Sequence, residues 1–211
     1  MRHLVLLGDS ILDNGAYLNG GPAVIAHVQR RLPDGWRASL SAEDHAMTDD
    51  IPQQLETLPP EATHLLLRVG GNDALLHEDI LETPVTSSRE ALLRLSEMAR
   101  EFEATYRRAV HACLGCHRPL LVCTIYHGNF PDPQVQQCAA VALTVFNDVI
   151  LRVAVETGLK VIDLRRVCDT PDDYANPLEP SVSGGAKIAQ AIVRAVTEPA
   201  HCARGANVVA A

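Results

Sequence analysis

The chain of 211 residues is short enough for one hydrophobic core, because single domains reach about 250 residues before chains split. Its net charge of −8 disfavours a nucleic-acid partner, since a phosphate backbone would be repelled. Hydrophobic residues make up 47% of the chain and aromatic residues only 4%, as is typical of sheets covered by helices on both faces. We expect a single domain over residues 1–198 and a loosely held tail over 199–211.

Short apolar runs alternate along the chain with longer segments of helical period. The predicted strands span residues 3–7, 37–41, 64–69, 119–125 and 160–163. The predicted helices span about 20–32, 48–57, 87–114, 134–157 and 182–197. Thr48 or Asp49 is expected to cap the second helix, and Ser87 or Ser88 the third. The alternation predicts an α/β fold, a three-layer doubly wound sheet of about five parallel strands.

The amino-terminal residues suggest a cytoplasmic protein. Only four apolar residues separate His3 from Gly8, too few for the apolar region of a signal peptide or for a membrane span. In the cytosol the six cysteines are expected to be reduced. They stand at positions 113, 116, 123, 138, 168 and 202.

One pair of cysteines has a spacing that is found in cofactor-binding motifs. Cys113, Cys116 and His117 spell the motif of c-type haem attachment. The segment closes a predicted helix and has no export signal before it, which argues against haem and against a thioredoxin-like pair. A zinc site would need a second Cys or His pair at metal spacing, and the sequence has none. We therefore expect neither a cofactor nor a metal.

Ligands of open α/β sheets bind outside the carboxyl ends of the strands, so the loops after the predicted strands are the places to seek function. The loop after the first strand begins with Gly8, Asp9 and Ser10. Ser10 can be read as a helix cap or as a nucleophile. The loop after the third strand begins Gly70-Gly71-Asn72-Asp73, in which glycines permit a sharp turn and Asn72 offers a neutral donor. A hydroxyl and a neutral donor on neighbouring loops are two of the parts that acyl transfer needs.

With these blocks the sequence resembles the GDSL or SGNH hydrolases, a family of esterases and lipases, from about residue 3 to residue 197. Residues 8–11, Gly-Asp-Ser-Ile, resemble the first block of the family, and residues 70–73 resemble its Gly-x-Asn-Asp block. Residues 179–184, Glu-Pro-Ser-Val-Ser-Gly, resemble its closing block. The resemblance implies the flavodoxin-like SGNH hydrolase fold and an acyl-serine at Ser10. It also implies an oxyanion site formed by Ser10, a residue of the second block, Gly71 and Asn72.

The sequence departs from the family pattern at two places. Asn176 and Glu179 stand where the family has its catalytic Asp and His, and His45 stands where the second block has a glycine. A free Glu has a pKa near 4.3 and a free His near 6.5, so Glu179 as the base would cost roughly 1.5 to 3 kcal/mol, or tenfold to a hundredfold in rate. His45 and His127 lie on loops at the same sheet edge and are alternative bases, with Glu179 then orienting the imidazole.

These residues predict a serine-dependent hydrolase of a small soluble ester or an acetylated sugar. Asp9 and Asp13 are interpreted as groups that organise the loop around Ser10, and Asn176 as a supporting residue of the closing block. The alternative, from another class, is a non-catalytic module that retains the fold and a ligand pocket but has lost its base. The tail at 199–211 also leaves a homodimer possible.

Overall fold

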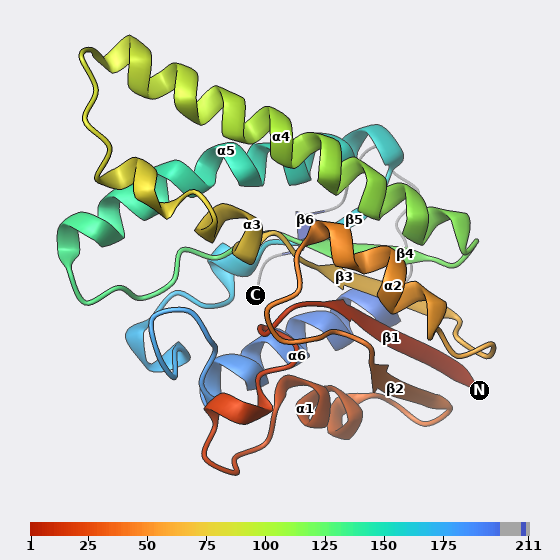
Figure 1. Ribbon diagram of the computed structural model, residues 1–211. Helices are drawn as coiled ribbons and strands as arrows, with labels where there is room; N and C mark the ends of the chain where they lie inside the picture. The colour runs from red at the N-terminus through yellow and green to blue at the C-terminus, as the bar shows by residue number, and fades with distance from the viewer. Residues whose placement is uncertain (199–207, 210–211) are drawn as a thin grey trace.

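A six-stranded parallel sheet runs through the middle of the molecule in the computed structural model, which describes residues 1–198 and 208–209 (Figure 1). The strands are β1 (Arg2–Gly8), β2 (Trp36–Leu40), β3 (His64–Arg68), β4 (Leu120–Cys123), β5 (Lys160–Ile162) and β6 (Val208–Val209). Their order is β2-β1-β3-β4-β5-β6. The five predicted strands are confirmed, whereas β6, which pairs in parallel with β5, was not predicted. The rest of the predicted tail, 199–207 and 210–211, lies outside the described residues.

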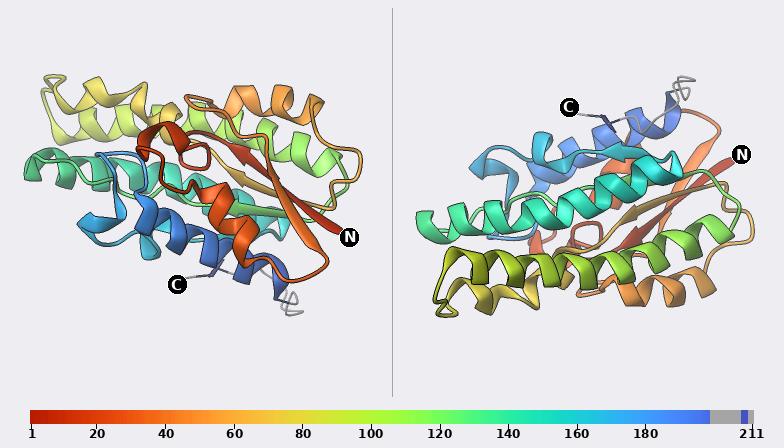
Figure 2. Two further views of the ribbon diagram at one scale, coloured as in Figure 1. Left: turned by 90° about the horizontal axis from the view of Figure 1, so that it is seen from below. Right: turned by 90° about the horizontal axis from the view of Figure 1, so that it is seen from above.

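Helices cover both faces of this sheet (Figure 2). One face carries α1 (Val24–Arg31) and α6 (Val182–Thr197), and the other carries α2 (Ile51–Glu56), α4 (Ser88–Gly115) and α5 (Pro133–Thr157). A short helix, α3 (Gly71–Leu75), follows β3 directly. Five 3-10 turns complete the described elements: η1 (Gly15–Tyr17), η2 (Thr48–Asp50), η3 (Glu78–Leu81), η4 (Leu164–Arg166) and η5 (Pro171–Asp173).

The predicted helix caps are confirmed for α4 and wrong for α2. Ser87 accepts a hydrogen bond of 3.2 Å from an amide in the first turn of α4. The second predicted helix is divided, because residues 48–50 form a 3-10 turn and α2 begins only at Ile51. The Thr48 hydroxyl does not cap that helix, since it donates instead to the carboxylate of Asp73 on α3. A tertiary contact therefore replaces the expected local one.

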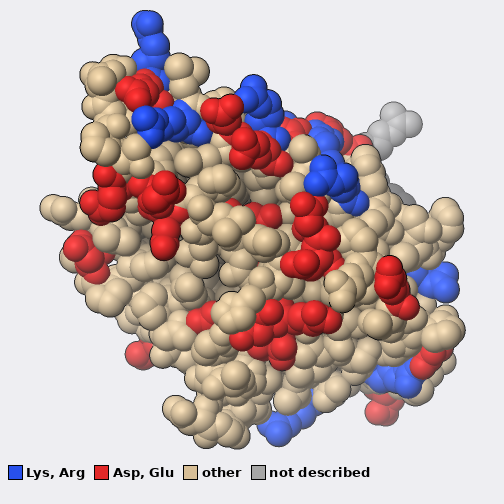
Figure 3. Space-filling model, in the orientation of Figure 1, with Lys and Arg blue, Asp and Glu red and all other residues tan. Residues whose placement is uncertain are grey.

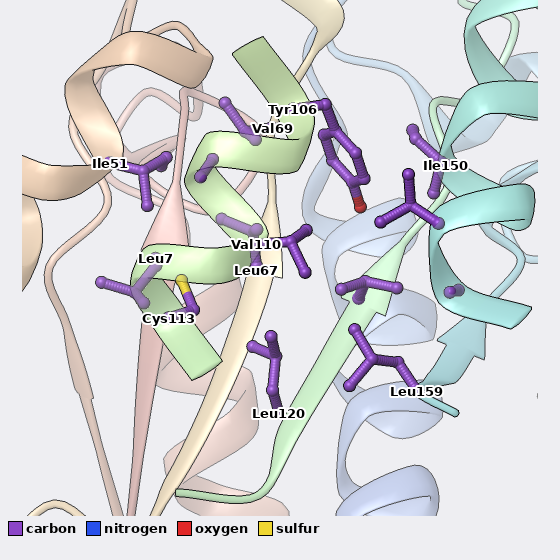
Figure 4. Packing of buried hydrophobic residues seen from close by; sticks show 14 of the residues in the cluster. Leu7, Ile51, Leu67, Val69, Tyr106, Val110, Cys113, Leu120, Ile150 and Leu159 are labelled. Carbon is purple, nitrogen blue, oxygen red and sulfur yellow. The ribbon is translucent and has the colours of Figure 1, made fainter. Parts of the chain in front are cut away.

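The hydrophobic core consists of two clusters, one on each face of the sheet. The alternating side chains of β3 contribute to both. Leu65 and Leu67 point toward α4 and α5, whereas Leu66 between them points toward α1 and α6. Figure 4 shows the first half, in which Tyr106 of α4 and Ile150 of α5 pack over the strands. Parallel strands buried on both faces are continuous apolar runs in the sequence, which explains why their positions could be predicted.

The strand order creates the place for a site. The sheet order reverses at β1, which lies between β2 and β3. The connection from β1 to β2 passes through α1 on one face, while the connection from β3 to β4 passes through α4 on the other. The loops that leave β1 and β3 therefore diverge and leave a crevice at the carboxyl ends of these strands.

Candidate active site

The backbone at the end of β1 turns sharply to present Ser10. Gly8 has a φ of +137°, and a Cβ atom there would lie 1.7 Å from the carbonyl oxygen of Arg68 on the adjacent strand. Only glycine fits this close approach. The side-chain amide of Gln54 accepts from the Gly8 N–H at 2.8 Å and donates to its carbonyl at 2.7 Å. Gln54, which lies on α2, thus pairs with both main-chain polar groups of Gly8 at the end of β1.

Asp9 forms a buried ion pair with Arg68 beneath the loop that carries Ser10. The side chains are 1% and 3% exposed, and Nη1 of Arg68 donates to Oδ2 of Asp9. The other carboxylate oxygen of Asp9 accepts from the Ile11 N–H at 3.2 Å. Burial raises the pKa of the Asp9 carboxyl group, and the Arg68 guanidinium opposes that shift. Asp9 therefore organises the loop, and the main-chain N–H of Asp13 joins it by donating to the Asp9 carbonyl at 3.1 Å.

The structure brings Ser10 and Glu179 together across 169 positions of the sequence. The Ser10 hydroxyl donates to Oε1 of Glu179 at 3.3 Å, and both side chains are buried. A carboxylate that accepts a hydrogen bond from a hydroxyl is the arrangement that general-base catalysis requires. Such contacts are often long before substrate binds and shorten in the reactive complex. Ser10 does not begin a helix, so its interpretation as a cap is wrong.

The loop that carries Glu179 is fixed through its main chain. Oδ1 of Asn176 accepts from the amides of residues 178 and 179, each at 2.9 Å. The Tyr126 hydroxyl donates to the Leu178 carbonyl, and Nδ2 of Asn14 donates to the Pro180 carbonyl at 3.1 Å. Asn176 therefore does not orient the carboxylate of Glu179 as the third member of a triad would; it shapes the turn on which Glu179 sits.

The block at the end of β3 ties α3 to the loop after β2. Nδ2 of Asn72 donates to the Ala46 carbonyl at 2.9 Å, which leaves its second N–H for another acceptor. The carboxylate of Asp73 accepts from the Thr48 amide at 3.2 Å and from its hydroxyl, and burial raises the pKa of Asp73. Gly71 stands directly over Arg68, whose Nη1 lies 3.2 Å from the position of a Cβ atom on Gly71.

The two histidines considered as relocated bases lie in different surroundings. The side chain of His45 is 83% exposed and its Nε2 lies 3.5 Å from a carboxylate oxygen of Asp44, so the structure does not bring His45 to Ser10. Its φ of +63° lies in the left-handed region, where the family pattern has a glycine. His127 does line the cavity beside Ser10. Burial, with Arg165 nearby, lowers the pKa of His127 from its ordinary value of 6.5.

A cavity of about 140 Å³ opens at Ser10. Its polar end contains Ser10, Asn72, Glu179 and His127, and its walls are largely apolar. Carboxylate side chains cross the middle of the face shown in Figure 3, while basic side chains lie nearer its edges. The surface on this face thus reflects the net charge of −8.

Metal and thiol chemistry have no assembled site in the described part of the chain. Within residues 1–198 and 208–209, no group of three or more His, Cys, Asp or Glu side chains is placed to hold a metal ion. Cys113, Cys116, Cys123, Cys138 and Cys168 are free thiols. Burial raises the pKa of Cys113 to about 12, which makes this thiol inert at neutral pH.

Four residues that hold the site were not predicted from the sequence: Asn14, Gln54, Arg68 and Tyr126. Asn14, Gln54 and Tyr126 bond to residues far away in the sequence, and no local sequence pattern predicts such contacts. Arg68 did leave a signal, because a single charged residue closes an otherwise apolar strand. A charge at a position with two buried faces requires a buried partner.

The sheet order and the helices on both faces define a doubly wound α/β fold. Residues 6–185 match the model of the GDSL-like lipase/acylhydrolase family, and the chain belongs to this family of hydrolases of ester substrates. The sequence resemblance is thereby confirmed. No curated protein sequence matches the chain.

Solved structures share the fold at low identity. An extracellular lipase of Streptomyces rimosus superposes with a TM-score of 0.67 at 16% identity, covering 89% of this chain and 96% of the lipase. An acetylxylan esterase of Geobacillus stearothermophilus gives 0.66 at 20% identity, covering 94% and 95%. A carbohydrate acetylesterase of Sinorhizobium meliloti gives 0.65 at 14% identity, covering 93% and 98%. These likenesses bear out the predicted three-layer fold.

Proposed function

We propose that the protein hydrolyses carboxylic esters through an acyl-serine, with Glu179 as the general base. The observation that carries the proposal is the contact of 3.3 Å between the Ser10 hydroxyl and the Glu179 carboxylate, in a cavity that also holds the Asn72 amide. A nucleophile, an acceptor for its proton and an oxyanion donor are the three parts that acyl transfer requires.

In the first half of the reaction, the Ser10 oxygen attacks the ester carbonyl and its proton passes to Glu179. The negative charge on the carbonyl oxygen is met by the Ser10 amide, by the second N–H of Asn72 and by an amide of the loop at 42–48. Collapse of the tetrahedral intermediate breaks the bond to the leaving alcohol, which takes the proton from Glu179. The product of this half is an ester of Ser10.

In the second half, water attacks the acyl-serine and gives its proton to Glu179. Collapse returns that proton to the Ser10 oxygen and releases the carboxylic acid. A carboxylate is a weaker base than an imidazole by about two pKa units in free amino acids, so the proposal includes a rate tenfold to a hundredfold below that of a histidine at the same place.

The test is hydrolysis of p-nitrophenyl acetate and butanoate, and of an acetylated sugar, by the wild type and by two variants. Ser10→Ala is expected to abolish turnover, and Glu179→Gln, which keeps the shape but removes the base, to lower kcat by at least a hundredfold. Ser88→Ala and Glu82→Gln, at exposed positions, are the matched controls. A wild type no faster than Ser10→Ala on every ester would contradict the proposal and would favour the non-catalytic ligand-binding module.

A further inference from the structure

The cavity does not end at the catalytic side chains but continues as an apolar arm between α4 and α5. Ser10 and Glu179 stand at one end, while the arm is lined by residues of α4, α5 and η3. Figure 1 shows the amino-terminal halves of α4 and α5 extending together beyond the sheet, with α3 and η3 beside them. The arm therefore lies outside the core of the domain, although it is continuous with the site.

One face of α5 forms a wall of the arm. The lining residues of this helix are Val135, Ala139, Ala142, Leu143 and Phe146. Their spacing of four, three, one and three residues places them on one side of a helix. By length and composition, α5 is apolar enough to cross a membrane. Its buried residues nevertheless all lie in its carboxyl-terminal half. The apolar residues of the stripe that precede Phe146 explain this, because they line the cavity.

Apolar side chains of α4 and η3 also line the arm. Leu95 and Met98 line the arm from α4, and Ile80 and Leu81 line it from η3. A sugar in this arm would lose the hydrogen bonds that its hydroxyl groups make with water, and the polar side chains that line the cavity beside η3, His77 and Glu78, are too few to replace them. A hydrocarbon chain has no such requirement and gains from leaving water.

We propose that this arm binds the acyl chain of the substrate, and that Ala139 and Ala142 set the length of chain it accepts. The inference rests on the proposed ester hydrolysis and names its substrate class: esters of medium-chain, unbranched fatty acids. From Phe146 to Val135 the wall extends roughly 16 Å at the rise of an α-helix, which is long enough for an extended acyl chain to lie along it. The two alanines leave space halfway along, where a larger side chain would close the arm.

The first test is a series of p-nitrophenyl esters from acetate to decanoate, each kept below its critical micelle concentration. Burial of one methylene corresponds to about fourfold in affinity, so kcat/KM for octanoate should exceed that for butanoate by on the order of a hundredfold. Ala142→Phe should lower kcat/KM for octanoate by a similar factor and should lower that for acetate far less. A wild type that prefers acetate would overturn the inference.

Val141→Phe is the matched control, since the neighbouring side chain is 64% exposed and points away from the arm. It should leave the chain-length profile as it is. Ala139→Leu provides a second variant in case Ala142→Phe does not fold, and it should shift the preferred chain length in the same direction. If the control changes the profile as much as the two arm variants do, the arm is not the acyl site.

A measurement without turnover separates this inference from the proposed function. Ser10→Ala is titrated with 1-octanol and with 1-butanol in a calorimeter at several temperatures. The inference requires that octanol binds at least thirtyfold more tightly and with a negative heat-capacity change, the mark of buried apolar surface. Octanol binding by a protein that hydrolyses no ester would reject the catalytic proposal and keep the acyl site. Equal affinities for the two alcohols would reject the acyl site, whatever the esterase assay shows.

Discussion

Replacing Arg68 by methionine should destabilise the protein strongly, because it leaves the Asp9 carboxylate buried without its counter-charge. The two side chains are 3% and 1% exposed, so water cannot replace the lost partner. Removing one member of a buried ion pair costs about 3–5 kcal/mol. The guanidinium also lies over the Tyr126 ring, 5.6 Å from its centroid, and that contact is lost too. A typical domain has a free energy of unfolding of about 5–15 kcal/mol, so the expected loss is a fifth of it or more.

The loss should depend on pH in a definite direction. Burial raises the pKa of Asp9, and in the variant no guanidinium opposes the shift. The folded state then holds a proton that the unfolded chain, with an Asp pKa near 3.9, has already released. Unfolding therefore becomes easier as the pH rises above that value. The deficit of Arg68→Met relative to the wild type should be largest at neutral pH and should shrink toward pH 4.

Urea unfolding of both proteins at pH 4.5, 6.0 and 7.5 measures this deficit. The double variant Asp9→Asn with Arg68→Met supplies the control, since an uncharged pair removes the unpaired charge and should recover part of the stability. A deficit below about 1 kcal/mol at pH 7.5, or one that grows as the pH falls, would refute the account of Asp9 and Arg68 as a charge pair without access to water.

Three further outcomes follow from the site. Glu179→His should raise kcat by about tenfold to a hundredfold and move the acid limb of the pH–rate profile toward the imidazole range; an unchanged profile would show that residue 179 is not the base. Gly8→Ala should yield little folded protein, because a Cβ atom would lie 1.7 Å from the Arg68 carbonyl, and a soluble variant with the wild-type Tm would disprove that contact. Asn176→Ala removes two hydrogen bonds of 2.9 Å and should cost about 1–3 kcal/mol in urea unfolding while lowering kcat more than it changes KM; full activity would show that this turn does not position the base.

The sequence placed the strands well because buried parallel strands have a simple signature. Four of the first five strands, β1, β3, β4 and β5, contain an apolar run, whereas the edge strand β2 is Trp-Arg-Ala-Ser-Leu. The bounds of all five in the structure differ from the predicted ones by at most two residues. The strand β6 has two residues inside an Ala- and Val-rich tail, and nothing in so short a run distinguishes it from the residues around it. The loop predicted at 70–86 contains α3 and η3, which are too short for helical periodicity to register.

Topology alone decides which of the predicted site residues lie close together. Ser10 and Asn72 follow adjacent strands, and Glu179 reaches the same edge of the sheet, so the strand order brings these residues into one cavity. His45 lies at that edge as well, yet its left-handed backbone accompanies a side chain that is turned to solvent. A sequence gives the loop on which a residue lies, but the direction of its side chain depends on backbone torsions that only the folded structure reveals.

The side chains that fix the loop around Glu179 all bond to its main chain: to the amides of residues 178 and 179 and to the carbonyls of residues 178 and 180. The shape of this loop is therefore independent of which side chain stands at position 179. A chain built in this way can exchange one proton acceptor for another by a single substitution, without remodelling its scaffold. In the proposed mechanism, the identity of the base is then a variable that evolution or design can change separately from the fold, and with it the range of pH in which ester hydrolysis proceeds.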